Sequence, residues 1–139
     1  MNIPFQHRGT ETQREYLHAE LTREIIAAAI EVHRALGPGL LENAYEECLC
    51  HELHLRGVGF RRQVNLPVTY KDVRLDCGYR LDLVVDDKVV VELKAAESVL
   101  PVYEAQLLTY LRLSGLRVGL LINFGAPALR RGGIIRRIV

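Results

Sequence analysis

The sequence predicts an α/β domain in which helices flank a mixed central β-sheet, with the element order α-α-β-β-β-α-β-β. Three observations predict it: two helical patterns come first, a strand, turn and strand follow, and a further helix then precedes an apolar strand. A helix that connects two strands is typical of parallel pairing. The chain has 139 residues, which is enough for one well-packed domain and too few for two ordinary ones.

The two helices are predicted over residues 22–36 and 40–55. Residues 1–19 are polar, mixed in charge and without periodicity, so we expect a flexible arm there and a single domain over 20–139. Thr22 can cap the first helix, and the run Gly37-Pro38-Gly39 ends it. The apolar positions of the second helix, which we expect to be buried, are Leu41, Tyr45, Cys48, Leu49 and Leu53.

The strands are predicted from alternation and from turn residues. Residues 60–70 alternate apolar and polar side chains and contain Pro67, which indicates a strand near a sheet edge. Residues 79–85 and 89–95 form a hairpin around the polar turn 86–88. Pro101 begins a helix that Gly115 ends, and an apolar strand over 117–124 follows it. A loop over 125–133 then leads to a last strand, 134–139.

Charged residues on the hairpin are the main functional signal. Glu92 and Lys94 are two residues apart, so their side chains leave the same face of the sheet. A three-residue turn places Asp82 opposite Glu92, whereas a two-residue turn would break this register. The apolar run 89–91 indicates an interior strand, where unpaired charge is costly unless a partner or a metal compensates it. A solvated ion pair, worth roughly 0.2–1 kcal/mol, is the structural alternative.

Composition bounds the class of protein. The net charge is +1, but residues 1–59 sum to −4 and residues 60–139 to +5, and Arg outnumbers Lys fifteen to three. Arginine suits phosphate contact, so the basic half could face nucleic acid, although a solvated surface explains the same composition. No apolar run approaches the ~20 residues of a membrane span, and residues 1–20 lack a signal-peptide core. We therefore expect a cytoplasmic protein without membrane contacts.

The three cysteines lack paired spacing, which indicates reduced thiols. Cys50 and His54 are four residues apart on the second helix and could share a metal ion. Structural zinc sites usually have four ligands, however, and the remaining candidates project elsewhere. Packed thiols and surface histidines are the preferred interpretation.

Three motifs, in their order along the chain, resemble known nucleases. Asp82 with Glu92-Leu93-Lys94 resembles the motif of the PD-(D/E)XK nuclease superfamily, although Leu81 stands where that name has proline. The stretch 39–45 fits the Gly-x-x-Glu-x-x-Tyr pattern of the GxxExxY protein family. Gln106 and Tyr110 match the Gln-x-x-x-Tyr element of the RecB-like exonuclease branch. Taken singly, Glu42 is also explained as a solvated acid and Tyr110 as a core residue, whereas their joint order favours a site.

The resemblance implies a restriction-endonuclease-like core and a metal-dependent nuclease, with DNA as the expected substrate. It implies that Asp82, Glu92, the Leu93 carbonyl and Glu42 hold Mg²⁺ or Mn²⁺. Lys94 would orient water or stabilise negative charge, and Gln106 and Tyr110 would hold the water or the scissile strand. The alternatives are a non-catalytic nucleic-acid or protein-binding module and a small-molecule hydrolase with the same metal centre. A homodimer or a partner protein could choose the target.

Overall fold

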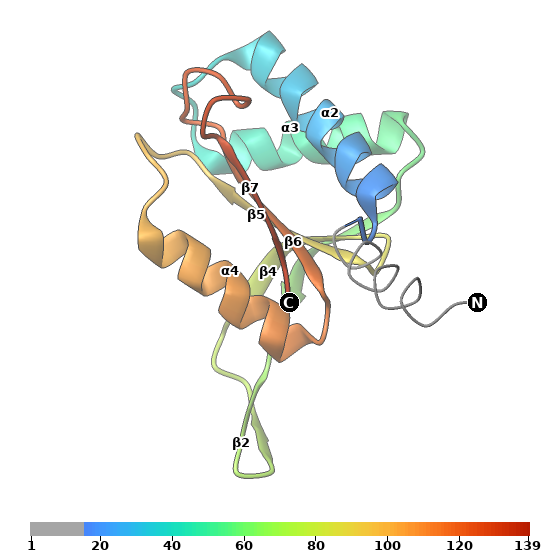
Figure 1. The fold of residues 1–139 in the computed structure, drawn as a ribbon, viewed down its shortest axis with the longest axis vertical. Helices are drawn as coiled ribbons and strands as arrows, with labels where there is room; N and C mark the ends of the chain where they lie inside the picture. The colour runs from blue at the N-terminus through green and yellow to red at the C-terminus, as the bar shows by residue number, and fades with distance from the viewer. Residues whose placement is uncertain (1–15) are drawn as a thin grey trace, which may run out of the picture.

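A five-stranded mixed sheet runs through the centre of the molecule, with two helices on one face and one on the other (Figure 1). The computed structural model describes residues 16–139. The strand order is β1-β4-β5-β6-β7; β5 and β6 are parallel, and the other neighbours are antiparallel. This arrangement confirms the predicted fold class. The bounds are α2 Ala19–Leu36, α3 Glu42–Leu55, β1 Phe60–Asn65, β4 Arg80–Val85, β5 Val89–Lys94, α4 Pro101–Ser114, β6 Val118–Asn123 and β7 Ile134–Ile138.

The central strand β5 is buried on both faces, as its apolar run predicts. Val89, Val91 and Leu93 pack into the core beneath α2 and α3, whereas Val90 packs against Leu107 of α4. Each large side chain buried in this way contributes about 1.5–3 kcal/mol. Glu92 and Lys94 follow Val90 at intervals of two, so they belong to the face that α4 covers.

The crossover helix α4 has the predicted limits. Pro101 occupies its first turn, and Gly115 ends it with a left-handed backbone, φ 77°. The following strand β6 adds parallel to β5, which confirms the predicted topology. No helix within residues 16–139 is long and apolar enough to cross a lipid bilayer.

Two predictions about the first two helices were wrong. Helix α2 already begins at Ala19, and Thr22 lies buried in its first turn, where its hydroxyl donates a hydrogen bond to the Ala19 carbonyl at 3.1 Å instead of capping the helix. Leu41 is 82% exposed because it precedes the first helical residue, so the buried stripe begins at Tyr45. Most of the expected arm, residues 1–15, lies outside the described residues.

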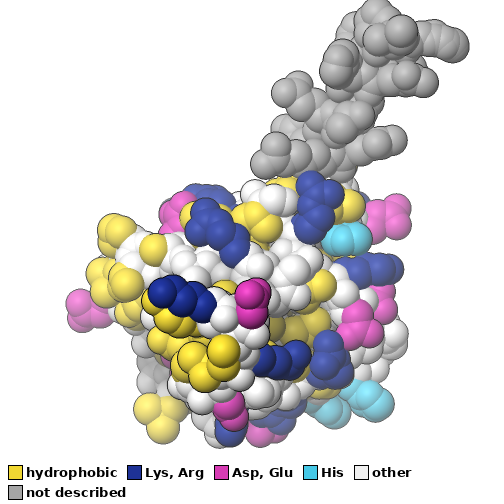
Figure 2. Space-filling model, turned by 90° about the horizontal axis from the view of Figure 1, so that it is seen from below, with side chains coloured by type: hydrophobic (Ala, Val, Ile, Leu, Met, Phe, Trp, Pro, Cys, Tyr) yellow, Lys and Arg dark blue, Asp and Glu magenta, His cyan; other side chains and the backbone are white. Residues whose placement is uncertain are grey.

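The predicted strand 60–70 is divided in the structure. It leaves the sheet after Asn65, because Leu66 turns into the core and donates its N–H to the Tyr79 carbonyl at 2.8 Å, and Pro67 has no N–H to donate. The chain then forms a separate hairpin of β2, Val68–Tyr70, and β3, Val73–Leu75. This hairpin projects from the body below α4 (Figure 1), and hydrophobic side chains gather beside Lys and Arg on the face seen from below (Figure 2). β1 is an edge strand, as predicted.

A buried amide clamps the segment that leaves β5. The Asn123 side chain is 1% exposed, donates to the Ala96 carbonyl at 3.0 Å and accepts the Ala96 N–H at 2.9 Å. The Gly125 N–H donates to the same Asn123 oxygen at 3.1 Å. The end of β5, where Lys94 lies, is therefore fixed to the end of β6.

Replacing Gly125 with alanine should lower the free energy of unfolding by roughly 1–3 kcal/mol. The added Cβ would lie 2.1 Å from the Ala96 carbonyl oxygen, a backbone atom that cannot rotate away. Denaturant unfolding measures the change. Gly59→Ala is the matched control, because no heavy atom lies within 4 Å of its added Cβ. Equal unfolding free energies for the two variants would show that the clamp tolerates the methyl group.

Candidate active site

Asp82 and Glu92 face each other where β4 and β5 diverge. The turn between the strands is the three residues 86–88, and the last ladder pair is Leu83 with Val91, which confirms the predicted register. Beyond that pair, hydrogen bonds from backbone N–H groups to carboxylate side chains replace the backbone-to-backbone bonds of the ladder. Glu92 Oε2 accepts the Asp82 N–H at 2.8 Å, and Asp82 Oδ2 accepts the Leu93 N–H at 2.9 Å. The two carboxyl groups are thus held against each other's strand.

Burial makes this pair reluctant to ionise. Glu92 is 7% exposed, and its burial, followed by repulsion from Asp82, raises its pKa to about 8. Burial also raises the pKa of Asp82, although the Leu93 N–H and Lys94 oppose the shift. Within residues 16–139 neither carboxylate forms an ion pair. A cation bound between them would remove the penalty for ionising both.

Lys94 projects from the last position of β5, on the same face as Glu92. Its Nζ lies 4.7 Å from the centroid of the Tyr103 ring on α4, a cation–π geometry that holds the ammonium group in place. The charge of Lys94 lowers the pKa values of Asp82 and Glu92, so the three groups are electrostatically coupled. Its carbonyl accepts the Phe124 N–H at 2.8 Å, which ties this strand end to β6.

Glu42 approaches the pair from the first turn of α3. Glu42 is exposed to solvent, but the protein around it removes part of its hydration. This partial desolvation, followed by repulsion from Asp82, raises the pKa of Glu42. Tyr45, one turn later, is fully buried and its hydroxyl donates to the Gly37 carbonyl at 2.5 Å and accepts the Leu40 N–H at 3.1 Å. Tyr45 therefore anchors the loop before α3 and so sets where Glu42 emerges.

The two α4 residues differ in their relation to the carboxylates. Burial and then the charge of Glu92 raise the pKa of Tyr110, whose ring centroid lies 6.1 Å from that of Tyr79. Tyr110 is therefore within electrostatic reach of the pair. Gln106 is exposed one turn earlier on the same helix, and in the described part of the chain it makes no hydrogen bond to the other candidate residues.

A polar cluster beneath Asp82 was not found from the sequence. Glu46, 6% exposed, accepts hydrogen bonds from Arg62 Nη2 at 2.8 Å and from Gln63 Nε2 at 3.0 Å. Gln63 and Asp82 lie between the β1–β4 pairs Arg62–Leu83 and Val64–Leu81, and hydrogen bonding by Gln63 lowers the pKa of Asp82. The only local signal is the polar position of Gln63 in a strand, because the cluster depends on α3 packing against β1.

The donor chemistry of the pair fits a hard divalent cation. Asp82 and Glu92 supply carboxylate oxygens, the ligands that Mg²⁺ and Mn²⁺ prefer. Across residues 16–139, no three His, Cys, Asp or Glu side chains converge closely enough to hold a metal ion. The cysteine-containing helix is chemically different: burial raises the pKa of the Cys50 thiol to about 11, which disfavours the thiolate that zinc requires.

A mixed sheet with an acidic pair and a lysine at the diverging end of a hairpin defines the restriction-endonuclease-like class of α/β domain. Residues 19–138 match the family model of the PD-(D/E)XK nuclease superfamily, and the chain belongs to that superfamily. No curated protein and no solved structure matches the chain. The narrower GxxExxY and RecB-like assignments stay predictions.

Proposed function

We propose that the protein is a metal-dependent nuclease that hydrolyses phosphodiester bonds, with DNA as the expected substrate. One observation carries this proposal: the buried carboxyl group of Glu92 and the half-buried carboxyl group of Asp82, both with raised pKa values, face each other beside an ammonium group. Structural stability alone gives no reason to bury such a pair, whereas cation binding does. Membership of the nuclease superfamily supports the same conclusion.

Asp82 and Glu92 would hold the cation, with the Leu93 carbonyl and Glu42 as further ligands. A bound Mg²⁺ or Mn²⁺ supplies Lewis-acid stabilisation of the phosphate and lowers the pKa of water. Glu42 lies on α3 and the pair on the sheet, so binding would join the two layers. The N–H groups of Asp82 and Leu93 orient one oxygen of each carboxylate before a ligand arrives.

Lys94 acts in this proposal as a charged donor and not as a base. Its Nζ lies over the Tyr103 ring, and its charge lowers the pKa values of Asp82 and Glu92. The ammonium group can therefore orient the attacking water or stabilise the charge that develops on the phosphate. Tyr110 lies near enough to Glu92 to orient the water or the scissile strand, and Gln106, one turn earlier, is proposed for the same role.

Cleavage of a labelled panel tests the proposal. The panel contains single-stranded, duplex and branched DNA and RNA, each incubated with Mg²⁺, with Mn²⁺ or with chelator. We expect cleavage that requires the divalent cation. The substrate that is cleaved fastest identifies the class of nucleic acid on which the protein acts. The proposal would be contradicted if no substrate were cleaved and if nucleic-acid binding weakened with salt but did not change on adding chelator. The protein would then be a nucleic-acid-binding module.

A further inference from the structure

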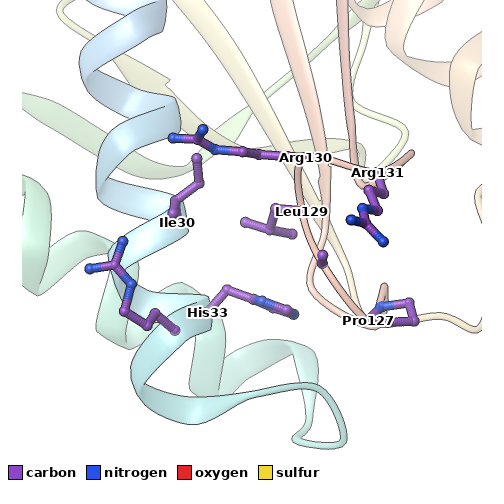
Figure 3. A pocket seen from close by; sticks show the side chains of 8 residues that line it. Ile30, His33, Pro127, Leu129, Arg130 and Arg131 are labelled. Carbon is purple, nitrogen blue, oxygen red and sulfur yellow. The ribbon is translucent and has the colours of Figure 1, made fainter.

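A cavity lies between α2 and the loop 125–133, apart from the carboxylate pair (Figure 3). Its volume is about 320 Å³, within the range of pockets that hold small molecules, about 300–1,000 Å³. The Phe124 ring lies in the core beside the cavity: its centroid lies 6.3 Å from that of His33, which lines the cavity, and 4.6 Å from that of Tyr45. The residues that line the cavity are distinct from the candidate active-site residues.

The lining combines an apolar floor with a cationic rim. Ile30, Pro127 and Leu129 provide apolar surface, and none of the described residues that line the cavity is acidic. In Figure 3, Arg130 extends toward α2 beside Ile30, and Arg131 lies on the side of Pro127. The remaining lining residues are His33, Arg34 and Ala128.

The rim arginines are available to an anion. Arg130 and Arg131 are exposed, and neither forms an ion pair with any residue of 16–139. Arg34 pairs with Glu31 at 3.3 Å, but both side chains are exposed, so this pair is weak. Arginine presents a planar fork that binds phosphate through two hydrogen bonds.

The loop is organised without a ligand. His33 is 8% exposed, and its Nε2 lies 2.8 Å from the Ala126 carbonyl oxygen, which can only accept, so Nε2 carries the proton. Within the loop, the Arg131 N–H donates to the Ala128 carbonyl and the Gly133 N–H to the Leu129 carbonyl, both at 3.1 Å. The wall of the cavity is therefore fixed to α2 on one side and by its own turn on the other.

We propose that this cavity binds one nucleotide unit, with the base against the apolar floor and the phosphate held by Arg130 and Arg131. Apolar surface and arginine planes both accept a base by stacking, and the same arginines pair with phosphate. The nucleotide can belong to a bound strand or be free. The first case rests on the proposed nuclease function, because the cavity would then hold part of a strand that is cut at the carboxylate pair.

Binding measurements test the cavity in a Lys94→Ala background without divalent cation, so that no strand is cut. The probes are a short fluorescein-labelled single-stranded DNA, followed by anisotropy, and dAMP, followed by calorimetry. The test variant is Arg130→Ala/Arg131→Ala. Arg112→Ala/Lys88→Ala removes the same charge from α4 and from the β4–β5 turn, away from the cavity. Ala128→Glu adds an acid to the wall and keeps both arginines.

We expect the arginine variant to bind DNA roughly ten- to a hundredfold more weakly, with a salt dependence reduced by about one per lost phosphate contact. Ala128→Glu should show a similar loss, and the charge-matched control a change of about twofold at most. Loss for DNA without detectable dAMP binding assigns the nucleotide to a strand. Loss for both probes assigns a site that also takes free nucleotides.

The cavity proposal is overturned if the arginine variant and Ala128→Glu both behave like the control with both probes. Its failure is distinct from that of the nuclease proposal. Arginine-dependent binding without any cleavage in the substrate panel would leave the cavity assigned and remove the nuclease. Metal-dependent cleavage together with binding that does not depend on the two arginines would support the nuclease and remove the cavity proposal.

Discussion

Replacing Lys94 with alanine should lower metal-dependent cleavage about 10²- to 10³-fold while the fold stays intact. The ammonium group lies beside the Asp82–Glu92 pair and is the cation held in place by the Tyr103 ring. Its removal takes away a positive charge at the place where negative charge would develop on the phosphate. The expected cost in stability is only about 0.5–1 kcal/mol, the value of one cation–π contact.

Single-turnover cleavage of the preferred substrate measures this effect, and denaturant unfolding checks the fold. Lys94→Met keeps most of the aliphatic stem over Tyr103 and should lose activity equally, which separates charge from packing. Lys88→Ala, in the exposed turn of the same hairpin, should cleave like the wild type. Wild-type cleavage rates in Lys94→Ala would remove the lysine from the mechanism.

Glu92→Gln should stabilise the cation-free protein near neutral pH and abolish its response to Mg²⁺ or Mn²⁺. The folded pKa of Glu92, about 8, lies above the ordinary glutamate value of 4.5, so the folded state holds its proton more tightly than the unfolded state. Stability therefore falls as pH rises through this window, by up to about 1.4 kcal/mol per pH unit, and levels off above it. The amide carries no such proton, so Glu92→Gln should lose this part of the pH dependence.

Urea unfolding across the window from pH 4.5 to about 8 measures the difference between the two profiles. Because a cation must displace the proton, calorimetric affinity for Mn²⁺ should rise with pH up to about 8. Asp82→Asn should also lose cation binding, whereas Glu97→Gln, an exposed residue after β5, serves as the control. Parallel stability profiles, with an unchanged thermal shift on adding Mn²⁺ to Glu92→Gln, would disprove the coupling.

The hairpin could be predicted from sequence because its information is local. Asp82, Glu92 and Lys94 lie within one short stretch, and a three-residue turn together with the two-residue period of a strand fixes their register. The same holds for α4, whose limits are set by Pro101 and Gly115. Local rules were sufficient wherever neighbouring residues determined the geometry.

Contacts between distant segments could not be predicted. Glu46 meets Gln63 because α3 packs against β1, and His33 meets Ala126 across 93 positions of sequence. The strand 60–70 was predicted as continuous because its alternation continues past Asn65, but the burial of Leu66 and its bond to Tyr79 end the pairing there. These contacts and the end of the strand depend on how whole helices and strands pack together. The local pattern of apolar and polar residues does not contain that information.

The projecting β2–β3 hairpin makes the domain modular in evolutionary terms. The bond from Leu66 to Tyr79 closes the insertion at its base, directly after the last β1–β4 pair, Asn65 with Arg80. Length or sequence can therefore vary over residues 68–75 without shifting Asp82 along its strand. The Tyr79 ring lies against that of Tyr110, so the base of the projecting hairpin stands beside the α4 residue nearest the carboxyl pair.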